Sequence, residues 1–224
     1  MKTSNKLLTG LLAIILLFGF TSNMVLKGEF DKIDRNNPFA GYRKEALKSF
    51  RYIHVEGKVL GYTQIQPGKD FEIQTAVAPE EIEWRIQNDT LRVRYKNDVG
   101  KNYPPDYNFE RAPITYIRAS TLYGIKSVST ACKVRDWTLD SLSLYQQGQD
   151  MQVEQNKVDT LTVNLEKQAS FRILKNNKVN SASVIVRDNS DFVTEDVYKT
   201  LSITADSTTR VNLPGNLLKQ AKSL

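Results

Sequence analysis

Apolar and polar residues alternate with a period of two over most of the chain from residue 50 onward. This pattern is typical of β-strands that bury one face and expose the other. The alternating segments are short, they end at Gly, Pro, Asn or Asp, and they are rich in Val, Ile, Thr, Tyr and Phe, as half-buried strands are. The pattern predicts strands within residues 50–56, 61–67, 71–77, 81–87, 91–97, 114–120 and 124–130.

Four stretches near the C-terminus are versions of one another. Each opens with a small polar residue and an alternating apolar run, and the four runs begin at Ser141, Thr160, Ser181 and Thr200. Each then reaches a second apolar start, and the spacing of these starts is close to 20 residues. The second starts are Met151, Phe171, Phe192 and Val211. A period of this length, built from short strands and polar corners, predicts an all-β fold of the β-solenoid type, in which stacking buries the apolar side of each rung.

The alternation also assigns positions to the interior and to the corners. The expected interior residues are Leu142, Leu144, Leu161, Val163, Leu165, Val184, Val186, Leu201, Ile203, Met151, Val153, Phe171, Ile173, Phe192, Val211 and Leu213, with Val158, Val179 and Val197 as a third inward segment. The expected corner column is Gly148, Gln168, Asn189 and Thr208. Small or amide side chains at corners form hydrogen bonds along such a stack, so we interpret this column as structural.

Other local signals are a hairpin, a loop and short helices. Two alternating runs are joined by Asn88-Asp89-Thr90, which predicts an antiparallel hairpin. Residues 99–112 are expected to form a loop, packed down by Tyr103, Tyr107 and Phe109. Residues 43–49 and 217–224 are candidates for short helices.

The N-terminal segment is a candidate membrane anchor. Residues 7–26 carry no charge and are bracketed by Lys6 and Lys27, and 20 helical residues at about 1.5 Å each span the roughly 30 Å hydrocarbon layer. We favour a retained anchor because no small-x-small cleavage triplet follows the apolar core; a cleaved signal peptide and a buried helix are the alternatives. Long domains after a first apolar segment usually translocate, which predicts a periplasmic or extracellular C-terminal domain. The expected organisation is an anchor or signal peptide (1–26), a charged tether (27–49), a β-helix domain (50–219) and a tail (220–224).

Composition narrows the possible chemistry. The formal net charge of +6 is modest, and Arg92, Arg94 and Lys96 alternate with apolar residues as on a solvated strand face, so nucleic-acid binding is not expected. The single cysteine, Cys132, excludes an internal disulfide and is expected in or near the core. With one histidine, His54, expected to face outward, neither a hydrolytic triad nor a zinc site is predicted. No cofactor motif occurs.

Acidic and aromatic residues are the remaining candidates. The acidic candidates for polysaccharide cleavage are Asp188, Asp191, Glu195 and Asp196. Asp150 and Asp191 share a column, but Ser170 lies between them, so they are expected about 10 Å apart, beyond the short arrangement of retaining glycosidases. We interpret these carboxylates as surface charge. Trp84 is expected to face inward, and Trp137 to lie in the core or a cap, with a surface contact as the alternative.

Three features resemble a known family. They are residues 50–77 with their QPGKD turn, the hairpin EIEWRIQNDTLRVRYKN, and GIKSVSTACKV followed by LDSLSL, VDTLTV, VNSASV and YKTLSI. Over about residues 50–218 the chain is similar to the “putative auto-transporter adhesin head” domains of the Bacteroidetes, in particular to a membrane-tethered subgroup. The resemblance implies a right-handed parallel β-helix with rungs of about 20 residues. The corners QQGQD, EKQAS, RDNSD and ADSTT depart from the small Ser/Gly corners of that family.

These observations support one leading hypothesis. The chain is expected to be a non-enzymatic, membrane-anchored β-domain outside the cytoplasm, a binding or adhesion module for an envelope protein or glycan. The alternative is an accessory or sensor subunit that docks onto a membrane complex of the cell envelope. A polysaccharide-active enzyme is the third hypothesis. The sequence predicts no cofactor, and it selects no binding residue.

Overall fold

In a computed structural model the chain divides into two units, residues 1–41 and 42–224. The structure describes residues 3–31, 39–96, 108–196 and 198–218. The first unit contains one helix, α1 (Thr3–Asp31). Its stretch Leu8–Asp31 is long and apolar enough to cross a membrane, with a mean hydropathy of 1.9, and a signal sequence would meet the same test. The helix extends past residue 26, where the apolar segment was expected to end.

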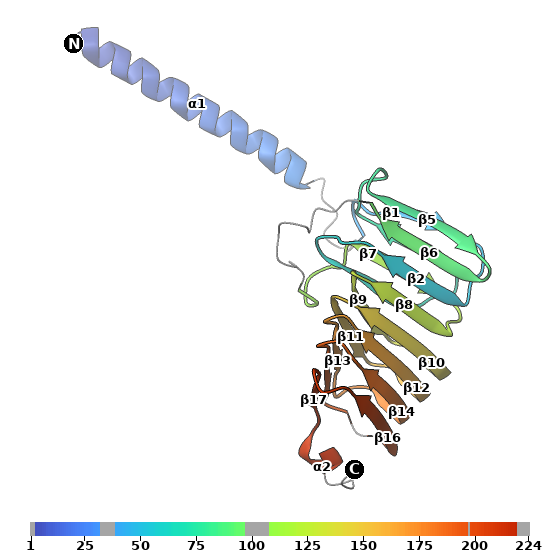
Figure 1. The fold of residues 1–224 in the computed structure, drawn as a ribbon. Helices are drawn as coiled ribbons and strands as arrows, with labels where there is room; N and C mark the ends of the chain where they lie inside the picture. Colours follow the sequence, from blue (N-terminus) through green and yellow to red (C-terminus); the bar gives the residue numbers. More distant parts are fainter. Residues whose placement is uncertain (1–2, 32–38, 97–107, 197, 219–224) are drawn as a thin grey trace. The chain divides into compact units, whose positions relative to one another are not determined.

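The second unit is built almost entirely of strands (Figure 1). The strands are β1 (Arg43–Ala46), β2 (Tyr52–Glu56), β3 (Tyr62–Pro67), β4 (Glu72–Thr75), β5 (Ile82–Gln87), β6 (Thr90–Tyr95), β7 (Thr115–Ala119), β8 (Gly124–Val128), β9 (Ala131–Arg135), β10 (Thr138–Gln147), β11 (Asp150–Glu154), β12 (Lys157–Glu166), β13 (Ser170–Ile173), β14 (Lys178–Val186), β15 (Asp191–Thr194), β16 (Thr200–Ala205) and β17 (Arg210–Asn212). A short helix, α2 (Gly215–Leu218), follows.

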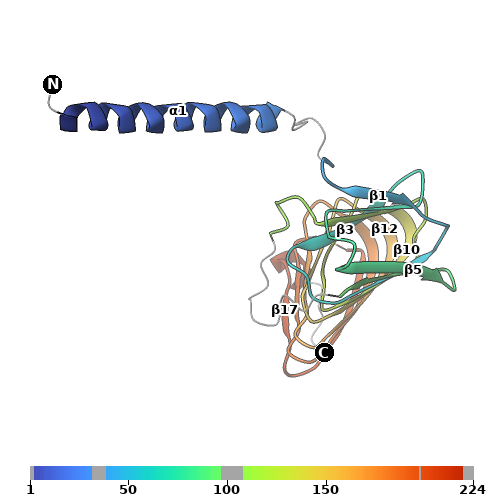
Figure 2. The same cartoon turned by 90° about the horizontal axis from the view of Figure 1, so that it is seen from above.

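These strands form two large sheets. The nine-stranded sheet has the order β1-β4-β7-β3-β9-β11-β13-β15-β17, and the eight-stranded sheet has the order β16-β14-β12-β10-β8-β2-β6-β5. Seen from above, β10 and β12 of one sheet lie across the interior from β3 and β17 of the other (Figure 2). The buried apolar residues of both sheets form one core cluster between them.

The expected right-handed parallel β-helix is wrong, because both sheets are mixed. Strand β4 runs antiparallel to β1 and β7, and β5 runs antiparallel to β6. The remaining pairs, including β10–β12 and β12–β14, are parallel. Alternation predicts which face of a strand is buried, but it does not determine the direction of the neighbouring strand. The hairpin turn at Asn88-Asp89 forces an antiparallel pair at one edge of the eight-stranded sheet.

The face assignments in the C-terminal half are confirmed among the described residues, except at Val211, which is exposed. Leu142, Leu161, Ala182 and Leu201 pair across successive strands, and all but Leu201 are buried. Leu201, Ile203 and Leu213 are half-buried, and Val211 is 37% exposed. Strands β16 and β17 end their sheets, so these side chains have a neighbouring strand on one side only. Val197 lies outside the described residues.

The corners use left-handed backbone conformations. Pairs of consecutive residues have positive φ at Gly148-Gln149, Lys167-Gln168 and Asp188-Asn189, and also in the hairpin at Asn88-Asp89. Two successive positive φ angles are typical of type I′ turns, which favour Gly, Asn and Asp. The predicted corner positions Gly148, Gln168 and Asn189 therefore lie in tight turns, and the predicted hairpin is confirmed.

Two further local expectations are settled. Residues 43–49, expected as a short helix, instead contain strand β1, which pairs with β4. Tyr103 and Tyr107 lie outside the described residues. Phe109 does pack onto the nine-stranded sheet: its ring contacts Tyr62 at 5.0 Å between centroids, and its carbonyl accepts a hydrogen bond from Lys133 Nζ at 3.0 Å.

Two buried asparagines connect the turns that precede β12 and β14. Asn156 Oδ1 accepts a hydrogen bond from the Trp137 N–H at 3.0 Å, and Asn156 Nδ2 donates to Asn177 Oδ1 at 3.0 Å. Asn177 Nδ2 donates in turn to the Val153 carbonyl at 3.0 Å. Trp137 is buried, as expected for a core or cap position, and its indole N–H donates to the Ile65 carbonyl.

Candidate functional site

The strands β10, β12 and β14 share a break in their alternation. In β10, Asp140 and Ser141 are both exposed, although successive residues of a strand normally face opposite sides. Asp159 and Thr160 repeat this arrangement in β12. The pairing of β10 with β12 is regular on both sides of this position, because Leu139 pairs with Val158 before it and Ser141 pairs with Thr160 after it. Two polar side chains per strand therefore face the solvent where a regular strand would present one.

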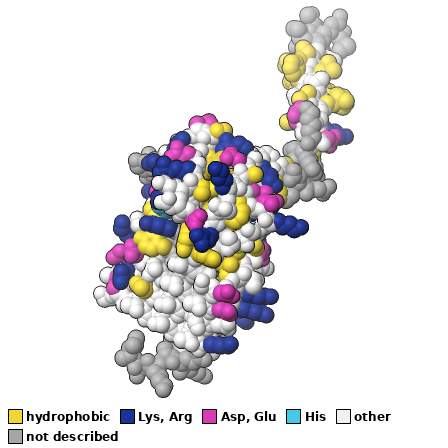
Figure 3. Space-filling view, turned by 90° about the vertical axis from the view of Figure 1, so that its right-hand side faces the viewer, with side chains coloured by type: hydrophobic (Ala, Val, Ile, Leu, Met, Phe, Trp, Pro, Cys, Tyr) yellow, Lys and Arg dark blue, Asp and Glu magenta, His cyan; other side chains and the backbone are white. Residues whose placement is uncertain are grey.

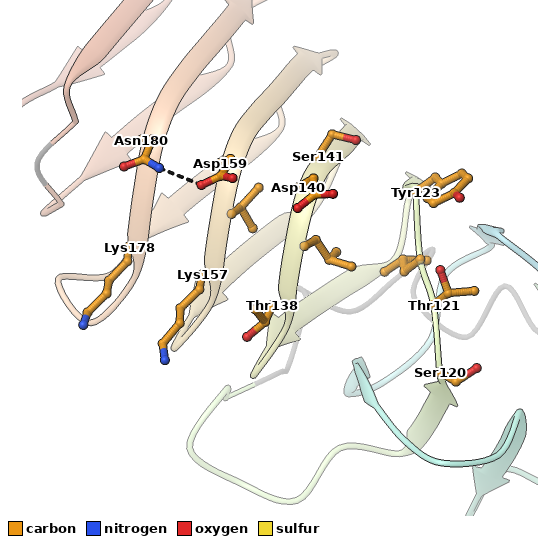
Figure 4. A pocket seen from close by; sticks show the side chains of 13 residues that line it. Ser120, Thr121, Tyr123, Thr138, Asp140, Ser141, Lys157, Asp159, Lys178 and Asn180 are labelled. Carbon is orange, nitrogen blue, oxygen red and sulfur yellow. Dashed lines mark hydrogen bonds between the residues drawn. The ribbon is translucent and has the colours of Figure 1, made fainter.

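The break places an acidic and amide column on the surface. Asp140, Asp159 and Asn180 occupy equivalent positions on three neighbouring parallel strands, which lie about 4.8 Å apart. Asn180 Nδ2 donates a hydrogen bond to Asp159 Oδ1 at 2.6 Å (Figure 4). The column therefore presents carboxylate acceptors and an amide at regular intervals.

A groove of about 770 Å³ lies along this column. Lys157 and Lys178 stand directly opposite each other at the start of β12 and β14 and line one part of it. Ser120, Thr121 and Tyr123, from the segment between β7 and β8, line another part (Figure 4). Two lysines accompany two aspartates, so the charges of the groove balance while its hydrogen-bonding capacity is high.

Two exposed tyrosines lie beside the groove. Tyr123 is 46% exposed and Tyr52 is 44% exposed, and their rings meet edge to face at 6.1 Å. The backbone of Tyr123 is fixed, because its N–H donates to the Arg51 carbonyl at 2.8 Å and its carbonyl accepts from the Ser143 N–H at 3.0 Å. The buried neighbour Leu122 anchors the same segment. The tyrosine pair is therefore an exposed aromatic surface on a rigid support.

Gly124 makes room for Tyr52. The two residues pair across β2 and β8, and a Cβ at Gly124 would lie 3.3 Å from Tyr52 Cδ1 and 3.2 Å from the Ser143 carbonyl oxygen. A side chain at this position would displace the tyrosine ring. Glycine therefore allows the ring to lie close to the sheet.

The residues singled out for chemistry lie apart from this groove. His54 faces outward from β2 as predicted, but its side chain is only 16% exposed. Cys132 is fully buried, as expected, and burial raises the pKa of its thiol to about 12. Trp84 is half-buried rather than fully inward: its ring packs against the core cluster, and its indole N–H donates to Glu45.

The four acidic candidates do not converge. Asp188 lies exposed in a left-handed turn, and Asp191 forms an ion pair with Arg210 at 2.9 Å. Glu195 and Asp196 follow the other end of β15, and Asp196 is buried. Asp150, Ser170 and Asp191 do pair in sequence across three strands, as predicted. Among the described residues, no group of three or more His, Cys, Asp or Glu side chains could hold a metal ion.

The sequence contains a signal for the groove, although the period-two pattern alone did not predict it. The segments LDSLSL, VDTLTV and VNSASV each place two polar residues in succession before an alternating run. This break in the period of two marks Asp140, Asp159 and Asn180. Tyr123 has no comparable signal, because its exposure depends on the turn that connects β7 to β8.

No family model matches the chain, and no curated protein matches it. Several solved structures align with most of it at low identity. A “putative adhesin” from Bacteroides fragilis is 14% identical with a TM-score of 0.38, and the alignment covers 76% of this chain and 95% of that one. A “putative adhesin” from Parabacteroides distasonis is 11% identical with a TM-score of 0.43, over 77% and 96% of the two chains. A “putative lipid binding protein” from the same species is 8% identical with a TM-score of 0.41, over 77% and 96%. Likenesses at this level assign neither family nor function.

Proposed function

We propose that residues 42–224 form a non-enzymatic module that binds glycans outside the cytoplasmic membrane, with α1 as its membrane anchor. The observation that carries this proposal is the exposed pair Tyr52 and Tyr123 beside the polar groove. Sugar rings present an apolar C–H face, which packs on aromatic rings, and hydroxyl groups, which pair with carboxylates and amides. The groove offers both kinds of partner.

The charge and rigidity of the groove support the same conclusion. The two aspartates and two lysines that line the groove balance, so the groove itself offers hydrogen bonds to hydroxyl groups and no net charge. Asp140, Asp159 and Asn180 lie on strands inside a continuous sheet, so their positions are fixed before a ligand arrives. Such preorganisation lowers the entropy lost on binding.

Binding without catalysis is supported by the positions of the reactive groups. The thiol of Cys132 is buried and protonated at neutral pH, because burial raises its pKa to about 12. His54 lies on β2, and it is not among the residues that line the groove. Asp159 already accepts a hydrogen bond from Asn180, as a ligand-binding carboxylate does. A non-enzymatic role is accordingly part of the proposal.

The test uses the full chain in phosphatidylcholine nanodiscs, screened against a panel of bacterial and plant oligosaccharides. The best ligand is then titrated calorimetrically into three proteins: wild type, Tyr123→Ala and Tyr123→Phe. Truncation of a central aromatic contact weakens binding by about tenfold or more. Tyr123→Phe keeps the ring and serves as the matched control, with an expected loss below about threefold. Unchanged affinity in Tyr123→Ala, or no ligand below about 1 mM, would refute the proposal.

Location has its own test. A C-terminal epitope tag is exposed to protease in intact cells and then in spheroplasts. Cleavage in intact cells indicates an extracellular domain, and cleavage only in spheroplasts indicates a periplasmic one. Protection in both preparations would contradict the proposed orientation.

A further inference from the structure

Four successive positions of one cross-strand row on the outer face of the eight-stranded sheet are basic, before the row reaches Tyr145 on β10. Arg85 on β5 pairs with Arg92 on β6, Arg92 pairs with His54 on β2, and His54 pairs with Lys126 on β8. Neighbouring strands lie about 4.8 Å apart, so the row extends over about 14 Å. The side chains of Arg85, Arg92 and Lys126 are exposed. We call these four residues the basic row.

The adjacent row of the same sheet is different, because its charges alternate. Glu83, Arg94 and Glu56 face one another across β5, β6 and β2. Arg94 lies 4.0 Å from Glu83 and 3.7 Å from Glu56. An ordinary solvated sheet face has this arrangement, since opposite charges stabilise cross-strand pairs and like charges destabilise them.

Among the described residues, the exposed cations of the basic row have no such ion-pair partners. Within the part of the chain that the structure describes, no carboxylate lies within 4 Å of the charged groups of Arg85, Arg92 or Lys126. Lys126 Nζ instead lies over the Tyr145 ring, 5.2 Å from its centroid. Arg92 Nη1 is 3.4 Å from His54 Nδ1. The three exposed cations of the row are therefore not neutralised by close ion pairs within the described ranges, and the nearest described carboxylates belong to the adjacent row.

The state of His54 reflects this environment. Partial burial lowers its pKa most, Lys126 and Arg92 lower it further, and Glu56, whose carboxylate is 3.8 Å from Nε2, opposes them. At neutral pH His54 is therefore uncharged and lies between the cations Arg92 and Lys126. The positive charge of the row comes from the two arginines and the lysine.

The basic row continues into the tyrosine pair. Tyr52 precedes His54 by two residues on β2, so both side chains face the same side of the sheet. Tyr52 contacts Tyr123, which lines the groove. On the face shown in Figure 3, charged side chains gather over the upper part of the domain, whereas the lower part is largely uncharged and polar. The groove adjoins the basic row through Tyr123, which lines the groove and contacts Tyr52, and through Tyr52, which shares a strand face with His54.

We propose that the basic row binds the carboxylate groups of an acidic glycan whose uncharged ring faces lie on Tyr52 and Tyr123. This inference rests on the proposed glycan-binding function and specifies its substrate class. Arginine pairs with carboxylates through two parallel N–H groups, which suits Arg85 and Arg92. A flat anionic surface such as a lipid bilayer would also meet the aspartates of the groove and Glu56 and Glu83, which disfavour it. A glycan is a single chain, so its carboxylates can lie over the basic row without covering the acidic residues beside it.

The test compares an acidic oligosaccharide with its neutral methyl ester. Hexagalacturonate and its fully methyl-esterified form are titrated into the full chain in phosphatidylcholine nanodiscs. The acid is expected to bind at least about fivefold more tightly than the ester at low salt, and this preference should fall below about twofold at 0.5 M salt. The double variant Arg92→Gln/Lys126→Gln should lose the preference while it still binds the ester. The control Lys175→Gln/Lys199→Gln removes the same charge at exposed positions outside the row and should retain the preference.

The outcomes separate the two proposals. If the ester binds but the acid binds no better, the acidic-glycan inference fails and the glycan-binding function stands. If the preference survives Arg92→Gln/Lys126→Gln, or is lost in the control, the basic row is not the binding site. If neither hexasaccharide binds and no other glycan does, both proposals fail. Binding to phosphatidylglycerol vesicles that depends on the row, without binding of the acid, would replace the glycan by a membrane surface.

Discussion

Replacement of Asn156 by alanine tests whether the buried asparagine pair stabilises the turns that precede β12 and β14. The Asn156 side chain is 1% exposed. Its Nδ2 donates to the carbonyls of Val134 at 3.1 Å and Glu154 at 2.8 Å, as well as to Asn177. Its Oδ1 is the acceptor of the buried Trp137 N–H. Asn156→Ala therefore removes several hydrogen bonds and leaves that N–H without its acceptor.

The size of the effect follows from these contacts. A buried donor left unsatisfied costs about 1–3 kcal/mol, and each further net hydrogen bond contributes about 1 kcal/mol. The Asn156 amide has two hydrogens for its three acceptors, so two further bonds are counted and the expected loss is about 3–5 kcal/mol in the free energy of unfolding, a large part of the stability of a typical domain. Urea unfolding of the full chain in detergent, followed by tryptophan fluorescence, measures the loss, because Trp137 is next to the change and the m-value reports whether unfolding stays two-state.

The matched control is Asn176→Ala, one residue before Asn177. Asn176 is exposed, and its Oδ1 accepts the N–H of exposed Gln155, which water can satisfy after the change. Its loss should stay below about 1 kcal/mol. A loss of less than 1 kcal/mol in Asn156→Ala, or equal losses in the two variants, would show that the pair is not a stabilising connection.

Three further predictions concern single positions. Burial lowers the pKa of His54 below 6.5 in the folded state, so the unfolded chain takes up the proton first and the free energy of unfolding should fall as the pH drops below about 6.5. In urea titrations between pH 7.5 and 5, His54→Gln should flatten this fall. An identical dependence of the free energy of unfolding on pH in the two proteins would contradict the assignment. Gly57 has φ of +103°, and a Cβ there would lie 2.3 Å from the Tyr95 carbonyl oxygen, so Gly57→Ala should lower the free energy of unfolding by about 3 kcal/mol in the same assay. A Cβ at Gly215 would meet open space, so Gly215→Ala should change the free energy of unfolding little. Equal effects of the two substitutions would rule out the steric explanation. The Cys132 thiol, with a pKa raised to about 12 by complete burial, should react with a disulfide reagent at pH 8 only after unfolding, and rapid reaction of the native chain would show that it is accessible.

The sequence predicts the strands of this protein better than it predicts their partners. Alternation located every strand from β2 to β8, and it placed buried residues such as Leu142, Phe171 and Val184 correctly. These are local properties, because side chains alternate within each strand. The direction and order of the strands depend on contacts between distant residues. The hairpin that makes one sheet mixed was therefore predicted from the sequence, whereas the spacing of the repeats predicted a parallel β-helix, which is wrong.

The candidate site shows the same division. Asp140 and Asp159 break the local period, and the sequence alone is enough to find that break. The basic row is different, because Arg85, His54 and Lys126 are far apart in the chain and meet only when β5, β6, β2 and β8 are assembled in order. Arg92 was correctly predicted on a solvated strand face, but its neighbours could not be inferred from its own strand.

The strand order has a consequence for how the chain is made. Strand β2 lies between β6 and β8, and β3 lies between β7 and β9. Ile53 on β2 therefore pairs with Ile125, far along the chain, whereas Leu142 on β10 pairs with Leu161 on the next strand but one. During synthesis from the N-terminus, β2 and β3 have open edges until β8 and β9 have emerged. Each later strand then joins an edge that already exists. Proteolysis of nascent chains arrested at increasing lengths should show protection of β2 only after β8 and β9 are out, and protection before that point would mean that β2 is stable without these partners. The strands β2 and β3 are thus synthesised well before both of their neighbours. A pause in translation between β3 and β9 would leave their unpaired edges exposed to other nascent chains.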